Sequence, residues 1–152
     1  MNGKVDLHVH TTVSDGRFSP QQIVAKAAGL GVNTIAITDH DNTGGVAPAI
    51  EATRDFPQLR VIPGVEISTH APGNEVHLLG YFIDCNNPKL SSALEELRSS
   101  RLGRAQAMID KLNGLGVGID WQQVKNIAGD STVGRPHIAR AMLEKGLSLI
   151  HI

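Results

Sequence analysis

The chain has 152 residues, a formal net charge of -1 and a 41% share of hydrophobic residues. This length and composition allow one ordinary globular domain, and they exclude the disordered and collagen-like classes. Because the charge balance is nearly even and contains no block of like charges, a broad electrostatic interaction with duplex DNA or with an anionic membrane has no support. A phosphate-bearing partner would have to be recognised by specific residues.

Cysteine usage and hydropathy bear on the compartment. The single cysteine, Cys85, cannot form an intramolecular disulfide, and no apolar stretch approaches the roughly 20 residues of a membrane span. Residues 1–5 lack the charged and apolar regions of a signal peptide. We therefore expect a cytoplasmic protein with no membrane partner, and the sequence leaves its oligomeric state open.

The first half of the chain alternates strand-like and helix-like segments. In chain order, we expect a strand at 5–10, a helix from 19 to about 31, a strand at 33–38, a helix at 46–55 and a strand at 60–69. The first helix begins with Ser19, Pro20 and a glutamine three residues after the serine, which is a typical helix start. This order of elements is typical of βαβ units around a parallel sheet.

The second half begins with a predicted hairpin. The turn-rich segment 70–74 is too short for a parallel crossover, so the segment 76–81 should pair antiparallel with the preceding strand. This pairing would place His77 close to Glu66, while His70 is expected to be a solvated turn residue. Three further helices are predicted, at 90–113, 121–127 and 136–145.

The last six residues differ from the rest of the chain. Residues 147–152 form an apolar string with no periodic partner and no polar finish, and they include His151. We interpret this segment as a non-native tail.

Histidines and carboxylates gather at the carboxyl ends of the predicted parallel strands. His8 and His10 are two residues apart on one strand, so their side chains point the same way and can share one divalent ion. Asp15 lies in a turn just after that strand, and His40 and Glu66 lie at the ends of the next two strands. Open α/β sheets and barrels collect their functional sites at these ends.

Together with His77, these residues supply six candidate ligands, which is more than one tetrahedral zinc ion uses. Zn, Mn and Fe accept mixed sets of imidazole and carboxylate ligands, so we expect at least two metal ions, with Glu66 as a bridging carboxylate. Asp6, on the same strand face, either orients a ligand histidine or is a buried structural acid. Asp39 is expected to point to the opposite face of its strand and to act as a cap.

Four basic residues are candidates for substrate binding. Arg101 and Arg104 lie three residues apart on one helix face, either as a phosphate-binding pair or as a solvated basic surface. Arg135 and His137 flank a proline at a predicted helix N-terminus, where anions are stabilised. His137 could instead be a metal ligand, and we favour a substrate contact.

The chain resembles the polymerase and histidinol phosphatase (PHP) superfamily of metal-dependent phosphoesterases over residues 4–146. The matching motifs are Asp6-Leu7-His8-Val9-His10-Thr11, Ser14-Asp15-Gly16, Ile37-Thr38-Asp39-His40-Asp41, Pro63-Gly64-Val65-Glu66, His77-Leu78-Leu79-Gly80-Tyr81 and Gly134-Arg135-Pro136-His137. Within the superfamily the chain is most similar to the bacterial branch of 3′,5′-bisphosphonucleotide phosphatases and 5′-3′ exoribonucleases.

The resemblance implies an α/β fold of the distorted (β/α)₇, TIM-like type. It also implies two or three divalent ions, with Mn as first choice and Zn or Fe as alternatives. By the resemblance, the metal ligands are His8, His10, Asp15, His40, Glu66 and His77, with Glu66 and Asp15 taking part in catalysis. Family members add a later histidine and an Asp-x-His motif, which have no counterpart here. We therefore expect residues 1–146 to be the N-terminal part of an incomplete barrel, with a helical insertion at about 88–146.

The expected function is hydrolysis of phosphate esters by a metal-bridging hydroxide. The expected substrates are 3′,5′-bisphosphonucleotides, the 5′ ends of short RNA, or both. Two alternatives remain open. One is a phosphatase of the histidinol-phosphate type, and the other is a non-catalytic PHP module or inactive fragment.

Overall fold

The computed structural model describes residues 3–71, 74–129 and 131–147, with the side chains of residues 70, 71, 74 and 75 outside the description. The elements are, in chain order, β1 (Lys4–Val9), α1 (Pro20–Gly29), β2 (Val32–Ile37), α2 (Val46–Ala52), a 3₁₀ turn (Thr53–Asp55), β3 (Arg60–Ala71), β4 (Asn74–Tyr81), α3 (Pro88–Gly114), α4 (Trp121–Ala128) and α5 (Arg135–Glu144).

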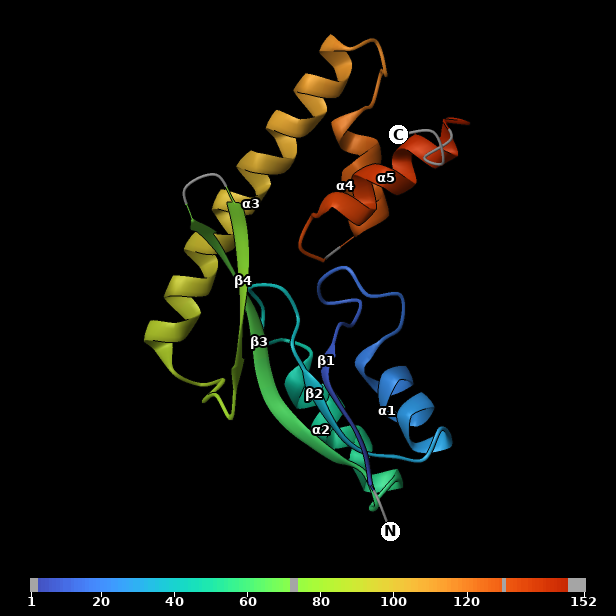
Figure 1. Ribbon diagram of the computed structural model, residues 1–152, viewed down its shortest axis with the longest axis vertical. Helices are drawn as coiled ribbons and strands as arrows, with labels where there is room; N and C mark the ends of the chain where they lie inside the picture. The colour runs from blue at the N-terminus through green and yellow to red at the C-terminus, as the bar shows by residue number, and fades with distance from the viewer. Residues whose placement is uncertain (1–2, 72–73, 130, 148–152) are drawn as a thin grey trace.

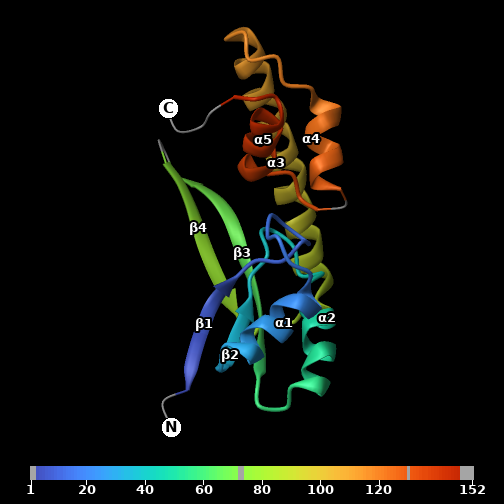
Figure 2. The same ribbon diagram turned by 90° about the vertical axis from the view of Figure 1, so that its right-hand side faces the viewer.

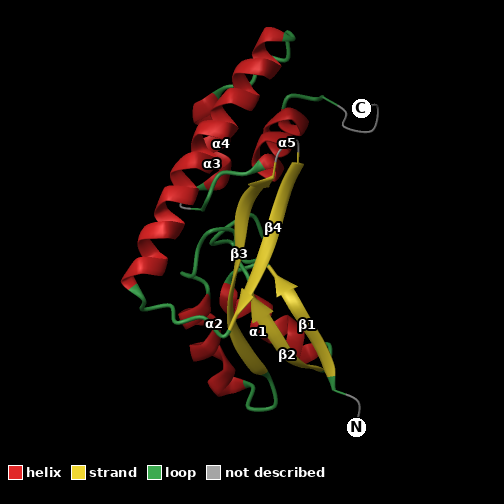
Figure 3. Cartoon of the chain, turned by 60° about the vertical axis from the view of Figure 1, so that its left-hand side comes forward, coloured by secondary structure: helices red, strands yellow, loops and turns green. Residues whose placement is uncertain are grey.

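The four strands form one sheet in the order β1-β2-β3-β4. β1, β2 and β3 run parallel, and β4 returns antiparallel to β3, as the sequence predicts. The strands are twisted and curled, and α1 and α2 lie together on one face of the sheet (Figures 1 and 3). The carboxyl ends of the three parallel strands therefore point toward the same end of the molecule.

A compact apolar core lies between the sheet and the first two helices. Its buried members are Val24, Ala27, Ile35, Ile37, Val46, Ala49 and Leu59. The predicted start of α1 is confirmed: Ser19 Oγ accepts a hydrogen bond from the N–H of Gln22, and the side chain of Gln22 accepts one from the N–H of Ser19. This capping box fixes where the helix begins, and the helix then presents Val24, which is 0% exposed, to the sheet.

β1 lies at one edge of the sheet and is more exposed than its alternating pattern predicts. Val5 is 58% exposed and Leu7 is 40% exposed. Within the described residues, β2 is the only strand paired with β1. Only Val9, at the end of β1, packs against the core under the sheet. The apolar face of this strand is therefore largely uncovered along most of its length.

The hairpin is longer than predicted. β3 continues through His70 to Ala71, and β4 begins at Asn74, so the expected turn over 70–74 is wrong. His70 pairs through its backbone with Glu75, and its side chain lies outside the described part of the chain. The β-branched residues that precede His70 continue the strand, and residues 72–73 lie outside the description. The antiparallel pairing itself is confirmed, and it places His77 opposite Ser68.

The remaining helices form a second apolar cluster. Its buried residues come from α3, α4, α5 and the connecting segments: Ala105, Ile109, Ile119, Val124, Ala128, Val133, Ile138, Ala141 and Met142. α3 runs along the hairpin at its N-terminal end and carries α4 and α5 against its C-terminal end (Figures 1 and 2). The three predicted helices are confirmed, with boundaries shifted by no more than two residues.

The C-terminal segment and the apolar character of the helices bear on two predictions made from the sequence. Residues 148–152, most of the predicted non-native tail, lie outside the described residues together with His151. None of the helices in the described part of the chain combines the length and the apolar character that a membrane crossing requires.

Candidate metal centre

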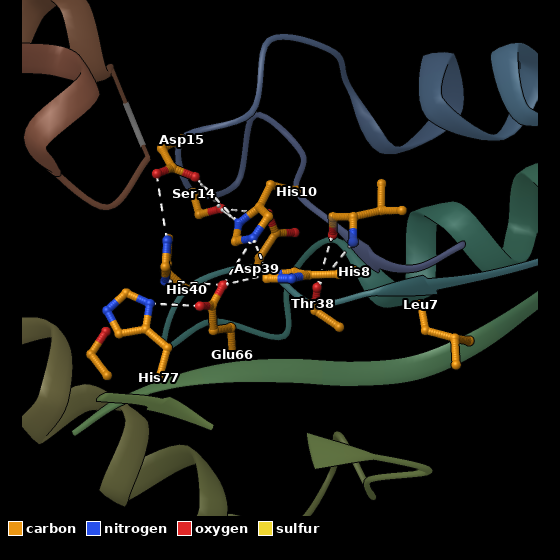
Figure 4. A network of polar contacts seen from close by, with 12 residues as sticks. Leu7, His8, His10, Ser14, Asp15, Thr38, Asp39, His40, Glu66 and His77 are labelled. Atoms are coloured by element: carbon orange, nitrogen blue, oxygen red, sulfur yellow. Dashed lines mark hydrogen bonds and ion pairs between the residues drawn. The ribbon is translucent and has the colours of Figure 1, made fainter. Parts of the chain in front are cut away.

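All six predicted ligands lie together at the carboxyl ends of the parallel strands (Figure 4). His8 lies in β1 and His10 directly after it, the following loop carries Asp15, and His40 comes just after β2. Glu66 lies within β3. These groups form three overlapping clusters, in each of which one ligand atom per residue lies within 4.8 Å of the others: His8 with His10 and Glu66, His10 with Asp15 and His40, and His40 with Glu66 and His77.

Glu66 lies at the centre of the site. Its side chain is 5% exposed, and Oε2 lies 2.9 Å from Nε2 of both His8 and His10. Its other oxygen, Oε1, lies 2.6 Å from Nδ1 of His77. The two carboxylate oxygens thus face different histidines. A carboxylate in this position could contact two neighbouring cations at once.

Asp15 and His40 close the opposite side of the site. Asp15 Oδ1 lies 3.3 Å from Nδ1 of His10, and Oδ2 lies 3.5 Å from Nε2 of His40. The Nδ1 atom of His40 is buried and has no hydrogen-bond partner, although it lies 3.5 Å from Glu66 Oε2. A buried imidazole nitrogen without a hydrogen bond, surrounded by carboxylate and imidazole groups, fits a divalent metal such as Mn, Zn or Fe.

The electrostatics keep the two carboxylates charged. Burial by itself raises the pKa of Asp15, but the hydrogen bond with His10 and the charges of His40, His10 and Arg101 outweigh it and lower the pKa to about 2. The pKa of Glu66 is also lowered, because hydrogen bonds from His8 and His77 and the nearby histidine charges outweigh burial. Both groups are therefore anionic at neutral pH, the form that binds cations.

The two central histidines are shifted in opposite directions. Burial and the charge of Arg101 lower the pKa of His40 to about 4, against the opposing effect of Asp15 and Glu66. For His10, burial is outweighed by the hydrogen bond and charge of Asp15, so its pKa is raised. At neutral pH His40 is uncharged, which is the form of imidazole that binds metals.

Asp39 differs from the sequence-based expectation of a cap. It is 0% exposed, and its carboxylate accepts hydrogen bonds from Thr11 N at 2.7 Å, Thr11 Oγ1 at 2.8 Å and Ser14 Oγ at 2.6 Å. The N-cap of α2 is Gly45 instead. Because β2 ends at Ile37, the strand alternation no longer determines where Asp39 points. Asp39 therefore holds the loop that carries Asp15.

Asp6 contributes neither of the two roles considered for it. It is exposed, so it is not a buried acid, and its Oδ1 accepts a hydrogen bond from the backbone N–H of His8 at 3.2 Å. This contact is local to the edge strand. In the part of the chain that is described, no hydrogen bond from a ligand imidazole to Asp6 is found.

Asp41 is a buried residue that the sequence reasoning missed. It is 0% exposed and has a φ of 50°, an unusual conformation for a residue other than glycine. Its Oδ1 accepts from the N–H of Ser68 at 2.8 Å, and Arg98 donates to its backbone oxygen at 2.8 Å. Its position directly after a candidate ligand was a usable signal, because two aspartates flank His40 in the sequence.

The four basic candidates for substrate binding line two different cavities. Arg101, Arg104 and Arg135 line one small cavity next to Gly134. Arg101 also donates to Ser68 Oγ at 2.5 Å and lies 3.4 Å from Asp41 Oδ2, so it belongs to the base of the metal centre. The Nη2 atom of Arg104 is buried without a hydrogen-bond partner. The helix face is therefore partly buried rather than solvated.

His137 does not line the arginine cavity, although it contacts Gly134, which does. Its Nδ1 accepts a hydrogen bond from the N–H of Gly134 at 3.0 Å, which closes the first turn of α5. Burial lowers the pKa of His137. With Asp15 it lines a separate cavity of about 700 Å³ between the loop after β1 and helices α4 and α5. No candidate metal cluster among the described residues includes His137.

The fold and the site define an α/β protein with a curled half-barrel sheet and a histidine–carboxylate centre whose donor atoms can hold metal ions. Residues 6–145 match the PHP domain model, and the chain belongs to this family. It is 39% identical over 142 residues to the 5′-3′ exoribonuclease Rnm of Escherichia coli, covering 93% of this chain and 48% of that protein.

Other relatives agree with this assignment. The chain is 34% identical to a 3′,5′-nucleoside bisphosphate phosphatase of Chromobacterium violaceum, over 93% of this chain and 50% of that protein. A structure solved as a metal-dependent phosphoesterase from Bifidobacterium adolescentis matches 96% of this chain and 51% of its own, with a TM-score of 0.85 and 34% identity. The chain thus spans about half the length of the relatives it matches.

Proposed function

We propose that this protein is a metal-dependent phosphoesterase that hydrolyses phosphate esters of nucleotides. The substrates proposed are 3′,5′-bisphosphonucleotides, the 5′ ends of short RNA, or both. The observation that carries the proposal is the set of three overlapping ligand clusters around Glu66, since adjacent clusters that share ligands suit two or three divalent ions. The names of the relatives support the choice of nucleotide substrates.

The ligands proposed are the six residues gathered at the site, His8, His10, Asp15, His40, Glu66 and His77. Mn is the first choice, and Zn or Fe would fit the same donors. Divalent ions bound there would lower the pKa of water and neutralise charge on a phosphoryl group. Among the chain's own groups, Glu66 and Asp15 supply the negative charge that holds the ions, and both are anionic at neutral pH.

Substrate binding is proposed for the basic residues beside this centre. Arg101, Arg104 and Arg135 line one cavity, and their guanidinium groups can bind phosphate oxygens with several donors. The buried Nη2 atom of Arg104 has no hydrogen-bond partner, so it is available to an anionic ligand. His137, at the first turn of α5, is proposed to contact the substrate from the Asp15 side.

We also propose a domain organisation for the chain. Residues 1–146 would correspond to the N-terminal part of a distorted (β/α)₇ barrel, with the helical segment at about 88–146 as an insertion. The match to the PHP model over 6–145 and the coverage of about half of each relative support this interpretation. The function of the relatives is therefore transferred as a proposal for the whole protein.

The test combines metal binding with phosphate release. Mn²⁺ binding to the purified protein should reach more than one ion per molecule, and phosphate should be released from adenosine 3′,5′-bisphosphate or 5′-phosphorylated short RNA faster than from histidinol phosphate. Glu66→Ala, or His8→Ala combined with His10→Ala, should abolish both. A metal content below one ion per molecule, or undiminished turnover in these variants, would refute the proposal.

A further inference from the structure

Asp39 precedes the candidate ligand His40 and is completely buried, yet its carboxylate faces a different part of the site. Its three hydrogen-bond donors all belong to the loop that follows β1: the N–H of Thr11, the hydroxyl of Thr11 and the hydroxyl of Ser14. Thr11 is 0% exposed and Ser14 is 1% exposed, so solvent does not compete for these bonds. The carboxylate is acceptor-only, which means that each hydroxyl must donate its hydrogen to it.

The single hydrogen of Ser14 decides what Ser14 can do toward His10. Ser14 Oγ lies 2.6 Å from Asp39 Oδ1 and 3.3 Å from Nδ1 of His10. Since the hydroxyl hydrogen is used by Asp39, Ser14 can only accept a hydrogen bond from the imidazole. Ser14 therefore favours a hydrogen on Nδ1 of the neutral His10 ring, and Asp15 Oδ1, 3.3 Å from the same nitrogen, favours the same assignment.

The opposite nitrogen of His10 faces the candidate metal position. Its Nε2 lies 2.9 Å from Glu66 Oε2 and 3.0 Å from Nε2 of His8 (Figure 4). A hydrogen on Nδ1 leaves the lone pair on Nε2, which is where a metal ligand needs it. The Asp39 carboxylate is also packed closely against Gly45. A Cβ at position 45 would lie 2.4 Å from Asp39 Oδ2, so a larger residue there would displace the carboxylate.

We infer that Asp39 is a positioning residue that acts through Ser14, holding His10 in the tautomer whose Nε2 lone pair faces the metal centre. The inference rests on the proposed metal site, and it adds a buried residue outside the ligand set. Among the described residues no hydrogen bond joins Asp39 to a ligand side chain, so its orienting effect passes through the Ser14 hydroxyl and the loop that carries Asp15, while its charge also acts on His10.

The experiment uses Asp39→Ala, Ser14→Ala and the double variant. Each single variant should weaken Mn²⁺ binding by roughly 10- to 100-fold, the usual effect of removing a group that orients a metal ligand. The double variant should bind no more weakly than Asp39→Ala, because Ser14 acts only when Asp39 holds its hydrogen. Val24→Ala, which removes a buried side chain from the core under the sheet, controls for destabilisation and should bind Mn²⁺ as the parent protein does.

A second readout does not depend on metal. In the metal-free protein at a pH where His10 is neutral, Glu66 Oε2, 2.9 Å from Nε2, competes for the ring hydrogen, so the ¹⁵N chemical shifts of the ring should report a mixture of the two tautomers. Asp39→Ala and Ser14→Ala should lower the share that carries the hydrogen on Nδ1, and Asp39→Asn, which keeps an oxygen acceptor for Ser14, should restore the parent signal.

An unchanged His10 tautomer and an unchanged Mn²⁺ affinity in Ser14→Ala would overturn the inference. It would also be overturned if the fold-loss of Mn²⁺ affinity in the double variant equalled the product of the two single fold-losses. If the parent protein bound no Mn²⁺ but its His10 tautomer depended on Ser14 and Asp39, the proposed function would fail while the positioning role would stand.

Discussion

The guanidinium Nη1 atom of Arg101 lies 3.4 Å from Oδ2 of Asp41. The Arg101 side chain is 12% exposed, and that of Asp41 is completely buried. This ion pair joins the long helix α3 to the segment that follows β2, one residue beyond His40. After burial, the charge of the same guanidinium is the next largest cause of the lowered pKa of His40, and it also contributes to the lowered pKa of Asp15.

Breaking that pair should destabilise the protein. Arg101→Met keeps the aliphatic part of the side chain but leaves Asp41 buried without its cation, which should lower the free energy of unfolding by roughly 3 kcal/mol. Urea denaturation measures this change. Arg140→Met is the matched control, because Arg140 is 69% exposed in its pair with Glu144 and should change stability by less than about 1 kcal/mol. Equal losses in the two variants would contradict the prediction.

Arg104 should affect substrate binding more than stability or metal binding. Arg104→Gln removes the buried Nη2 donor that is proposed to bind a phosphate oxygen. Because a charge-assisted hydrogen bond to the substrate is lost, KM for a nucleotide bisphosphate should rise by roughly 10- to 100-fold. The value of kcat and the Mn²⁺ affinity should change little. Steady-state kinetics with the Mn²⁺-loaded protein tests this expectation, and a fall in kcat at constant KM would argue against a binding role.

Two glycines should respond oppositely to the same substitution. A Cβ at Gly16 would lie 2.4 Å from the backbone oxygen of His10, so Gly16→Ala should force the loop to shift and cost roughly 1–3 kcal/mol of stability. Gly103, inside α3, has no heavy atom within 4 Å of such a Cβ, and Gly103→Ala should stabilise the protein by about 0.5–1 kcal/mol. Thermal unfolding of both variants checks the pair, and Gly16→Ala should also weaken Mn²⁺ binding.

The metal-free protein should lose stability in acid through His40. Its pKa is lowered from 6.5 to about 4 by folding, so the unfolded chain takes up a proton in that interval that the folded protein does not. Stability contributed by neutral His40 is therefore present above pH 6.5 and decreases as the pH falls toward 4. Denaturation of EDTA-treated protein should show this loss, and His40→Gln should flatten the curve between these pH values. Parallel curves for the two proteins would refute the assignment.

A second loss should follow at lower pH. The pKa of Asp15 is lowered from 3.8 to about 2, so its contribution is present above pH 3.8 and disappears as the pH falls through about 2. Asp15→Asn should remove this part of the acid dependence, and the loss through His40 should extend to lower pH, because the Asp15 charge opposes the lowering of the His40 pKa. Unfolding of the metal-free Asp15→Asn variant between pH 4 and pH 2 provides the measurement.

The sequence predicted the convergence of the ligands because a general rule of parallel sheets applies to them. His8 and His10 are two residues apart, so they share one face of a strand, because side chains alternate between the two faces. Residues that end successive parallel strands meet at one edge of the sheet. Antiparallel pairing alone predicted that His77 lies beside Glu66, and the two side chains are 2.6 Å apart, measured from His77 Nδ1 to Glu66 Oε1. These inferences needed only strand direction and register.

The buried supporting residues could not be predicted in the same way. Asp39 and Asp41 lie beyond the end of β2, where side-chain direction depends on loop backbone angles rather than on strand alternation. Asp41 adopts a positive φ, which no pattern in the sequence announced. The pairing of Asp41 with Arg101 also spans 60 positions in the chain, and it depends on how α3 packs against the sheet. Such contacts are properties of the tertiary structure.

Helix α3 has 27 residues, which at 1.5 Å per residue makes it about 40 Å long. The middle of the helix is attached to the sheet side through Arg98 and Arg101, and its C-terminal half carries the apolar cluster of α4 and α5. Arg101 and Arg104 on this helix line one cavity with Arg135, at the start of α5. The contact between Arg101 and Asp41 therefore also fixes where the start of α5 lies relative to the segment that carries His40.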